Sequence, residues 1–292
     1  MTAGSSSRWR RPSPGLGART WPTHRYAANV GFLFTDLPFL ARFVAARDAG
    51  FEAVEFDWPT EDQLGAMTHQ AFAAHVRSTG LAVSLFNLAG FDPLAGLHGM
   101  TGVPALRDAF RAHVPVAISL AMTLGCRKIH ALAGNAIEGV GRESQLACLV
   151  ENLTWVADQA APVGIVITLE ALNPVDFPRY LLPNPEAALR VVRSTGRANV
   201  RFQLDVYHLA MVGEDPSAVV DAAGPVIGHV QFADCPGRHE PGTGTLRFPD
   251  ILAALRRNGY DDWIGLEYKP TDVTSRDFSF VERTLGGKLR TR

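Results

Sequence analysis

The chain has 292 residues, of which 47% are hydrophobic and 20% are charged, and its formal net charge is -1. These values are typical of a globular protein, and the nearly neutral charge without a long basic block argues against a nucleic-acid-binding surface. The three cysteines, Cys126, Cys148 and Cys235, lie far apart without a CxxC motif, which argues against a disulfide framework or a zinc ribbon and favours a reducing, cytoplasmic compartment.

The first stretch of the chain, "MTAGSSSRWRRPSPGLGARTWPTH", differs in composition from the rest. It is rich in Ser, Gly, Pro and Arg and lacks the apolar core of a secretory signal. No uninterrupted apolar run of the sequence is long enough to span a bilayer, so no membrane association is expected. We predict a disordered tail over residues 1–24, a barrel domain over 25–275 and a C-terminal extension over 276–292.

From residue 25 onward, short β-type runs alternate with longer helical segments. The candidate strands are 27–34, 52–58, 82–87, 127–133, 164–170, 200–205, 227–234 and 263–268. Helical spacing with proline near the start and glycine at the end is clear over 38–50, 184–196 and 248–259, and a long amphipathic segment covers 143–164. Eight such units predict a single α/β domain, a (β/α)8 TIM barrel. The alternative, a doubly wound open sheet, lacks the GxGxxG motif after the first strand.

Four consecutive predicted strands finish near an oxygen-bearing side chain. These are Glu170, Asp205, Gln231 and Glu267. In TIM barrels the chemistry lies at the carboxyl ends of the strands, where these side chains would converge. Singly, each is better explained as a helix cap or turn residue, but three converging carboxylates repel one another unless a cation joins them. An all-oxygen set suits Mg²⁺ or Mn²⁺ better than zinc.

Several longer motifs of this chain resemble those of the hydroxypyruvate isomerases, a group of xylose isomerase-like TIM barrels that also contains the 2-oxotetronate isomerases. The motifs are "LEALN", "QLDVYH", "GHVQFADCPGRHEPGTG" and "GLEYKP". The resemblance covers nearly the whole chain after the tail. It implies an isomerase that interconverts hydroxypyruvate and tartronate semialdehyde through an enediolate. It also implies that Glu170, Asp205, Gln231 and Glu267 bind the metal and that Glu170 and Glu267 transfer protons.

Three further residues are predicted to bind the substrate, a short hydroxy-keto acid. His208 follows Asp205 by three positions and could donate to a substrate oxygen, or could simply be a satisfied histidine at a helix start. Arg238 suits the substrate carboxylate, the alternative being a solvated loop charge. Lys269 shares a strand face with Glu267 and would hold either that glutamate or the substrate.

Other residues are predicted to support the site without touching the substrate. Glu240 is expected to fix the seventh loop, and Glu55, His229 and His130 to lie behind the metal. Four aromatic residues are expected to close the pocket on its apolar side, although core packing explains them equally well: Phe34, Phe56, Trp58 and Phe86.

Three other functions stay open from the sequence. A ketose 3-epimerase of the same superfamily would use the same glutamates and metal, although its fourth ligand is usually histidine where this chain has Gln231. A nuclease on this barrel would need several metals, many histidine ligands and a basic face. A metal-binding barrel without turnover is kept open by Phe86, which stands where many relatives carry histidine, and by the altered loop after it. Barrels of this type often pair, so a homo-oligomer is compatible with the sequence.

Overall fold

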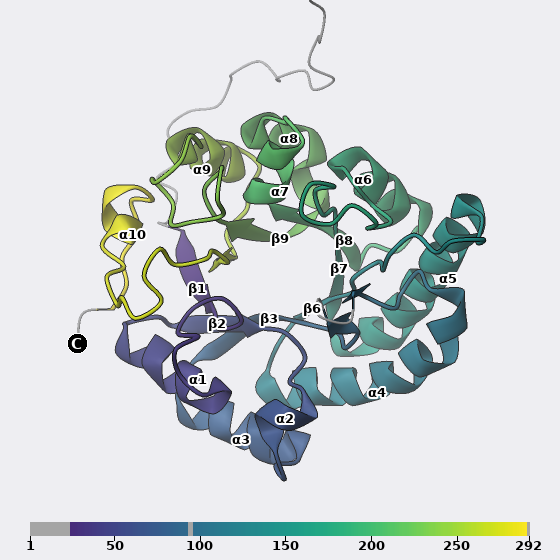
Figure 1. The fold of residues 1–292 in the computed structure, drawn as a ribbon, viewed down its shortest axis with the longest axis horizontal. Helices are drawn as coiled ribbons and strands as arrows, with labels where there is room; N and C mark the ends of the chain where they lie inside the picture. Colours follow the sequence, from purple (N-terminus) through teal and green to yellow (C-terminus); the bar gives the residue numbers. More distant parts are fainter. Residues whose placement is uncertain (1–23, 93–95, 291–292) are drawn as a thin grey trace, which may run out of the picture.

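The computed structural model of the chain describes residues 24–92 and 96–290, and its centre is a closed barrel of eight parallel strands (Figure 1). Around the barrel the strands follow the order β1-β10-β9-β8-β7-β6-β3-β2. Their bounds are β1 Arg25–Asn29, β2 Ala53–Phe56, β3 Ala82–Asn87, β6 Lys128–His130, β7 Val166–Glu170, β8 Val200–Asp205, β9 Ile227–Phe232 and β10 Trp263–Leu266. The predicted (β/α)8 barrel is confirmed.

Helices surround this barrel as an outer ring (Figure 1). They are α1 Phe39–Asp48, α2 Glu61–Leu64, α3 His69–Ser78, α4 Arg107–Leu124, α5 Arg142–Ala160, α6 Pro185–Ser194, α7 Val206–Met211, α8 Pro216–Ala223, α9 Phe248–Arg257 and α10 Phe280–Arg283. Helix α6 starts as its sequence predicts, because Asn184 accepts a hydrogen bond from the Ala187 amide and Pro185 occupies the first turn. A two-stranded hairpin, β4 (Phe91–Asp92) with β5 (Leu97–His98), follows β3 and was not predicted.

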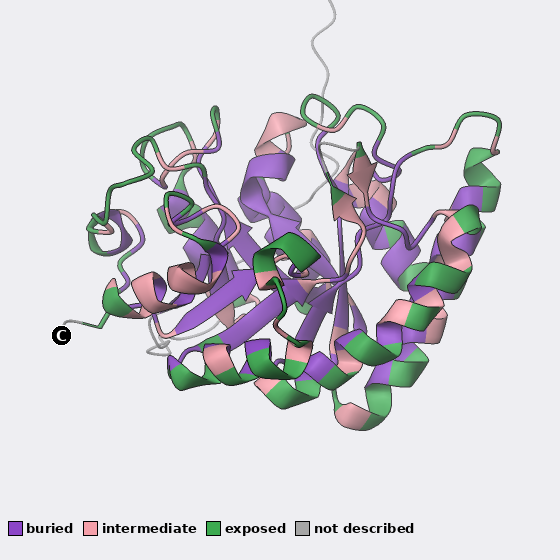
Figure 2. Ribbon diagram, turned by 60° about the horizontal axis from the view of Figure 1, so that its bottom comes forward, coloured by how far each residue is buried: buried purple, intermediate pink, exposed green. Residues whose placement is uncertain are grey.

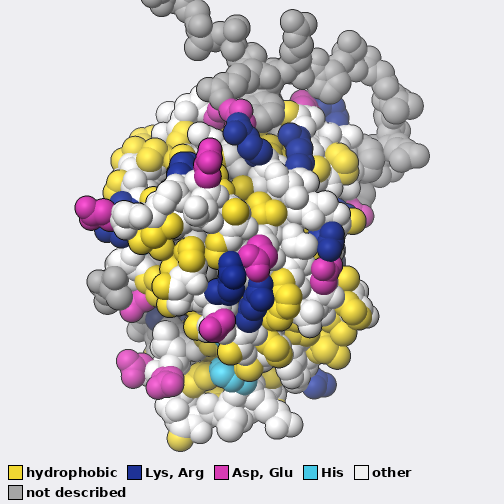
Figure 3. All heavy atoms as spheres, turned by 90° about the vertical axis from the view of Figure 1, so that its right-hand side faces the viewer, with side chains coloured by type: hydrophobic (Ala, Val, Ile, Leu, Met, Phe, Trp, Pro, Cys, Tyr) yellow, Lys and Arg dark blue, Asp and Glu magenta, His cyan; other side chains and the backbone are white. Residues whose placement is uncertain are grey.

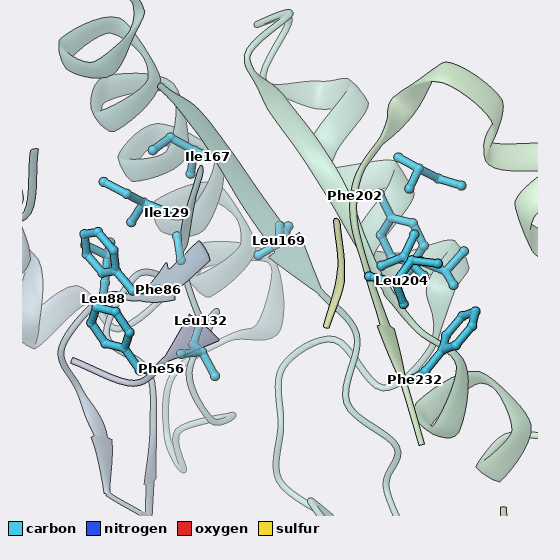
Figure 4. Close-up of a cluster of buried hydrophobic side chains, with 14 of the residues drawn as sticks. Phe56, Phe86, Leu88, Ile129, Leu132, Ile167, Leu169, Phe202, Leu204 and Phe232 are labelled. Atoms are coloured by element: carbon cyan, nitrogen blue, oxygen red, sulfur yellow. The ribbon is translucent and has the colours of Figure 1, made fainter. Parts of the chain in front are cut away.

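The barrel strands are buried on both faces (Figure 2). Their apolar side chains form the layer between the strands and the helices, where Figure 4 shows Phe56 beside Phe86. The two rings stack with centroids 5.6 Å apart, and Phe56 also meets Phe72 of α3 at 5.5 Å. The prediction that Phe56 and Phe86 close the pocket is therefore wrong, because alternate strand positions face opposite sides.

The other strand face points into the barrel, and much of it is polar. Glu55 of β2 contacts His229 and Gln231 of β9, although β1 and β10 separate those strands in the sheet. Such contacts must cross the barrel interior. Gly265 of β10 makes room for this, because a Cβ there would collide with the Glu55 carboxylate. Branched aliphatic side chains usually fill this space in TIM barrels. The polar interior of this barrel differs from that usual packing.

The ends of the chain relate differently to the barrel. The predicted tail lies outside the described residues, apart from His24. The residues after 275 pack on the barrel through Phe278, whose ring lies 4.9 Å from that of Phe51, and the Arg290 amide donates to the Gly50 carbonyl at 2.9 Å. The division of the chain into a tail, a barrel domain and a C-terminal extension stays a prediction.

The surface is mixed in character. Acidic and basic side chains are interspersed on the face shown in Figure 3. Among the helices of the described ranges, none is long and apolar enough to cross a membrane. The expected absence of a nucleic-acid partner and the cytoplasmic location stay predictions.

Candidate active site

A pocket lies at the carboxyl ends of the strands, where the sequence predicts the chemistry. It is lined by Glu170, His208, Arg238 and Glu267, all four among the predicted site residues. Asp205 and Gln231 adjoin the pocket, because Asp205 binds Arg238 and Gln231 binds the lining residue Gln203. The aromatic walls are Phe32, Phe91 and Phe177 in place of the four that were predicted.

Arg238 lies between two of the carboxylates. Its Nη2 donates to Asp205 Oδ2 at 3.0 Å and to Glu267 Oε2 at 2.9 Å. The side chain is buried, so it is not a solvated loop charge. Its guanidinium packs on the rings of Phe32 and Tyr207, at 4.7 and 5.2 Å from the centroids. Its Nε–H is buried without a hydrogen-bond partner in the described part of the chain, so this one donor is left for a ligand to satisfy.

The three carboxylates are held in an environment that disfavours their charge. Burial raises the pKa of Glu170 well above its usual value, and the nearby Asp205 and Glu267 raise it further. Burial also raises the pKa of Glu267 well above its usual value, although Arg238 opposes this. Burial raises the pKa of Asp205 to about 6, again against Arg238. One arginine therefore compensates only part of the negative charge.

The donor atoms fit a hard divalent cation. Glu170 Oε1 is buried and has no hydrogen-bond partner among the described residues. Burying an unpaired carboxylate oxygen is costly unless a cation or proton satisfies it. Glu170, Asp205 and His208 each bring one potential ligand atom within 4.8 Å of the others. Carboxylate oxygens at this density are what Mg²⁺ or Mn²⁺ prefers.

The hydrogen bonds of His208 argue against this histidine as a metal ligand. Its Nδ1 accepts a hydrogen bond from the backbone N–H of Asn173 at 3.2 Å. Burial lowers the pKa of His208 well below its usual value, so the ring is neutral and its proton sits on Nε2. That N–H points toward Asp205 Oδ2 and Glu170 Oε1, at 3.7 and 3.9 Å. His208 thus lines the pocket as a hydrogen-bond donor, and its contact with the substrate stays a prediction.

Gln231 is oriented by the residues around it. Its Nε2 donates to Glu55 Oε1 at 2.8 Å, and its Oε1 accepts from Gln203 Nε2 at 2.8 Å. The amide oxygen therefore faces the Glu170 side of the barrel, where Gln203 Nε2 also lies 3.3 Å from Glu170 Oε2. An oxygen with two lone pairs can accept this bond and still contribute to a metal site.

A network of hydrogen-bonded polar side chains inside the barrel supports the site. Lys128 Nζ donates to Asp262 Oδ2 and to His229 Nδ1, both at 3.0 Å. Because an ammonium group only donates, the neutral His229 carries its proton on Nε2, which donates to Glu55 Oε2 at 2.7 Å.

These hydrogen bonds reach Glu267, one of the two predicted catalytic glutamates. Asn29 Nδ2 joins Glu55 Oε1, at 3.1 Å, to Glu267 Oε1, at 3.0 Å. The predicted position of Glu55 and His229 behind the site agrees with these contacts, whereas Lys128, Asn29 and Asp262 were not anticipated.

The loop after β9 is fixed by two acidic residues. Asp234 is fully buried and accepts hydrogen bonds from the amides of Cys235, Gly242 and Leu246. Glu240 Oε1 accepts from the Thr271 amide at 3.0 Å, which ties this loop to the one after β10. Glu240 thus plays the loop-fixing part expected of it, and Asp234 was missed.

Lys269 is not brought into the pocket. Strand β10 ends at Leu266, and the Lys269 side chain is exposed. Its backbone N–H instead donates to the Arg238 carbonyl at 2.7 Å, and its carbonyl oxygen lies 2.8 Å from His239 Nδ1. The predicted contact with Glu267 or substrate assumed that strand alternation continues past Glu267, where the strand has already ended.

Comparisons with known proteins show the family to which the chain belongs. A family model described as xylose isomerase-like TIM barrel matches residues 43–284. The chain is 42% identical over 270 residues to a putative hydroxypyruvate isomerase of Streptomyces coelicolor, covering 88% of this chain and 95% of that one. It is 33% identical to the hydroxypyruvate isomerase of Escherichia coli (88% and 98% covered) and 35% identical to a 2-oxo-tetronate isomerase of Pectobacterium atrosepticum (90% and 99% covered).

Solved structures show the same architecture. A crystal structure from Brucella melitensis, titled AP endonuclease, family 2, superposes with a TM-score of 0.83 at 33% identity, covering 89% of this chain and 99% of that one. A D-psicose 3-epimerase from Clostridium cellulolyticum superposes with a TM-score of 0.69 at 18% identity, covering 84% of each chain. The second likeness shows the fold alone.

Proposed function

Because the chain belongs to the xylose isomerase-like TIM barrel family, we propose that it interconverts hydroxypyruvate and tartronate semialdehyde with a bound Mg²⁺ or Mn²⁺. Its predicted place in the hydroxypyruvate isomerase group and its assignment as an isomerase are confirmed by curated relatives of 33–42% identity that carry these names. The substrate, the metal and the mechanism are the proposal. The observation that carries it is the pair of buried glutamates, Glu170 and Glu267, facing one pocket beside a buried arginine.

The reaction moves a carbonyl group by one carbon. One glutamate takes a proton from C3 of hydroxypyruvate, which gives an enediolate, and the other returns a proton to C2. The hydroxyl proton moves from the C3 oxygen to the C2 oxygen, so atoms and charge balance. Carboxylates work as acid and base near neutral pH only if their pKa is raised, as burial does for Glu170 and Glu267.

Three other groups bind and orient the substrate in this proposal. The unpartnered Nε–H of Arg238 donates to the substrate carboxylate. The Nε2–H of His208 donates to a substrate oxygen near Glu170 and Asp205. Glu170, Asp205, Gln231 and Glu267 would hold a divalent ion, which when bound would supply Lewis-acid stabilisation of the negative charge that develops on the substrate.

A second candidate substrate is 2-oxotetronate, which is one carbon longer. The relatives named 2-oxo-tetronate isomerase are 35% identical over nine-tenths of this chain, as similar as the Escherichia coli hydroxypyruvate isomerase. The same two glutamates would move the same carbonyl by one position. The epimerase hypothesis has weaker support, since its structural likeness is one of fold alone. The hypothesis of a metal-binding barrel without turnover is weakened, because Phe86 packs outside the pocket.

A turnover assay tests this proposal. Purified, metal-stripped protein is given hydroxypyruvate, and tartronate semialdehyde is coupled to a reductase that consumes NADH. We expect NADH loss only after Mg²⁺ or Mn²⁺ is added, and the same assay with 2-oxotetronate ranks the second candidate. Turnover that is equally fast without metal, or none with either keto acid, would contradict the proposal.

Metal affinity should depend on pH because cation and protons compete for the same carboxylates. With the pKa of Asp205 near 6 and that of Glu170 raised, both hold protons in acid and must release them to bind metal. We expect the affinity for Mn²⁺ to rise about tenfold per pH unit for each proton released, and to level off above the carboxylate pKa values. Titration followed by electron paramagnetic resonance at several pH values measures this. A constant affinity across the range would rule out these carboxylates as ligands.

A further inference from the structure

Three polar side chains on the β2, β3 and β6 side of the pocket have no part in the proposed mechanism. Asp57, Asn87 and His130 all line the pocket and are joined in a row. Asn87 Nδ2 donates to Asp57 Oδ1 at 2.6 Å, and Asn87 Oδ1 lies 3.0 Å from His130 Nδ1. Asn87 thus holds the other two side chains in place.

The hydrogen bonds of this row determine where its protons are. The donation to Asp57 fixes the orientation of the Asn87 amide, so Asn87 Oδ1 can only accept from His130. Gln203 Nε2 also lies 3.4 Å from His130 Nδ1, but its two hydrogens are directed to Gln231 Oε1 and Glu170 Oε2. His130 therefore carries its proton on Nδ1, and its Nε2 presents a lone pair to the pocket. That Nε2 is buried without a hydrogen-bond partner among the described residues, and the nearest carboxylate oxygen, Glu170 Oε2, lies 3.6 Å away.

The surroundings of Asp57 keep its second oxygen available. No hydrogen bond within the described ranges engages Asp57 Oδ2. Gly31 approaches from the loop after β1, and a Cβ at this glycine would lie 3.1 Å from Asp57 Oδ2. Asp57 Oδ2 and His130 Nε2 are thus two hydrogen-bond acceptors without donors on one wall.

The opposite wall of the pocket carries a hydrogen-bond donor instead of acceptors. Arg238 there carries a positive charge and one Nε–H without a hydrogen-bond partner among the described residues. A substrate carboxylate placed beside Asp57 would be repelled, whereas a hydroxyl group can donate to either acceptor. The charges therefore set the direction in which a hydroxy-keto acid enters, with its carboxylate at Arg238 and its hydroxyl end toward β2.

We propose that Asp57 and His130, held by Asn87, form a hydroxyl-binding subsite that selects substrates with a hydroxyl group at the end remote from the carboxylate. The proposal rests on the proposed function, because it assigns the carboxylate to Arg238. Such a subsite makes the protein bind hydroxylated keto acids more tightly than keto acids without that hydroxyl group. A buried acceptor such as His130 Nε2 discriminates strongly against a ligand without the hydroxyl, since it is then left unpaired.

The test compares two unreactive ligands that differ by this hydroxyl, D-glycerate and D-lactate. Each is titrated calorimetrically into Mg²⁺-loaded protein. Wild-type protein should bind D-glycerate roughly 10- to 100-fold more tightly than D-lactate. Asp57→Asn keeps the hydrogen bond to Asn87 and removes the free carboxylate oxygen, so the ratio should fall toward one through weaker glycerate binding. His130→Phe should do the same. Asp62→Asn, an exposed aspartate on α2, is the matched control and should leave the ratio unchanged.

The outcomes separate the subsite from the proposed function. Equal binding of both ligands to wild-type protein, no binding of either, or an unchanged ratio in Asp57→Asn and His130→Phe would overturn the subsite. A thermal melt shows whether each variant is folded, and lactate binding shows whether the Arg238 side still works. Failure of the proposed function would instead appear as absent turnover in wild-type protein.

Discussion

Replacement of Glu267 by glutamine is expected to lower kcat/KM for the isomerase reaction roughly 100- to 10,000-fold, the usual contribution of a general acid or base. Glutamine has nearly the same shape, and its oxygen can still accept the hydrogen bond from Asn29 that Glu267 Oε1 accepts at 3.0 Å. The glutamine amide nitrogen, however, replaces the Oε2 that accepts from Arg238 Nη2 at 2.9 Å, and Glu267 is also a proposed metal ligand, so saturating Mg²⁺ and a stability measurement are needed to isolate the missing proton transfer. Steady-state kinetics with saturating Mg²⁺, together with a thermal melt, measures both effects.

The matched control for this variant is Glu61→Gln. Glu61 is exposed on α2, away from the residues that line the pocket. It should keep full activity. Wild-type rates in Glu267→Gln would remove this residue from the mechanism, and a large loss in both variants would point to damage unrelated to the site.

Replacement of Lys128 by methionine is expected to lower the free energy of unfolding by about 1–3 kcal/mol, because it leaves the buried His229 Nδ1 without its donor and the partly exposed Asp262 without its cation. The Lys128 side chain is only 6% exposed and donates to both Asp262 and His229. Burial disfavours the charge of Asp262, but Lys128 nevertheless holds the pKa of Asp262 below its usual value. Urea unfolding followed by circular dichroism gives the measurement.

An exposed ion pair provides the comparison for Lys128. Arg276 pairs with Asp36 at 2.8 Å, and the two side chains are 36% and 24% exposed. Arg276→Met should cost no more than about 1 kcal/mol, since solvent screens such pairs. A loss of equal size in the two variants would mean that the hydrogen bonds that link Asp262, Lys128, His229 and Glu55 contribute little to stability.

The barrel and the strand ends of its second half could be predicted from the sequence, since both depend on local patterns. The alternation of strands and helices predicted the eight units. A carboxylate or amide at the end of a strand predicted Glu170, Asp205 and Gln231 as site residues. Faces were harder to assign. Asn87, not Phe86, points into the barrel from β3, and a shift of one residue moves a side chain to the opposite face.

The polar interior could not be predicted, because it depends on barrel closure. Lys128 meets His229 across two intervening strands, and the two residues are 101 positions apart in the chain. Nothing near either residue in the sequence indicates that contact. Asp57 was missed for a simpler reason. It lies two positions after Glu55 and faces the same side, but a carboxylate beyond a strand end also suits an ordinary turn.

Proton exchange with solvent tests most directly whether two buried glutamates and a divalent ion act on a carbonyl compound in this pocket. Hydroxypyruvate is incubated in D₂O with Mg²⁺-loaded protein, and the C3 proton signal is followed by NMR against an enzyme-free control. We predict that wild-type protein replaces C3 protons with deuterium, that metal-stripped protein does not, and that Glu170→Gln with Glu267→Gln in one chain abolishes the exchange. Exchange at the wild-type rate in the double variant, or no exchange by metal-loaded wild-type protein, would contradict the proposed chemistry.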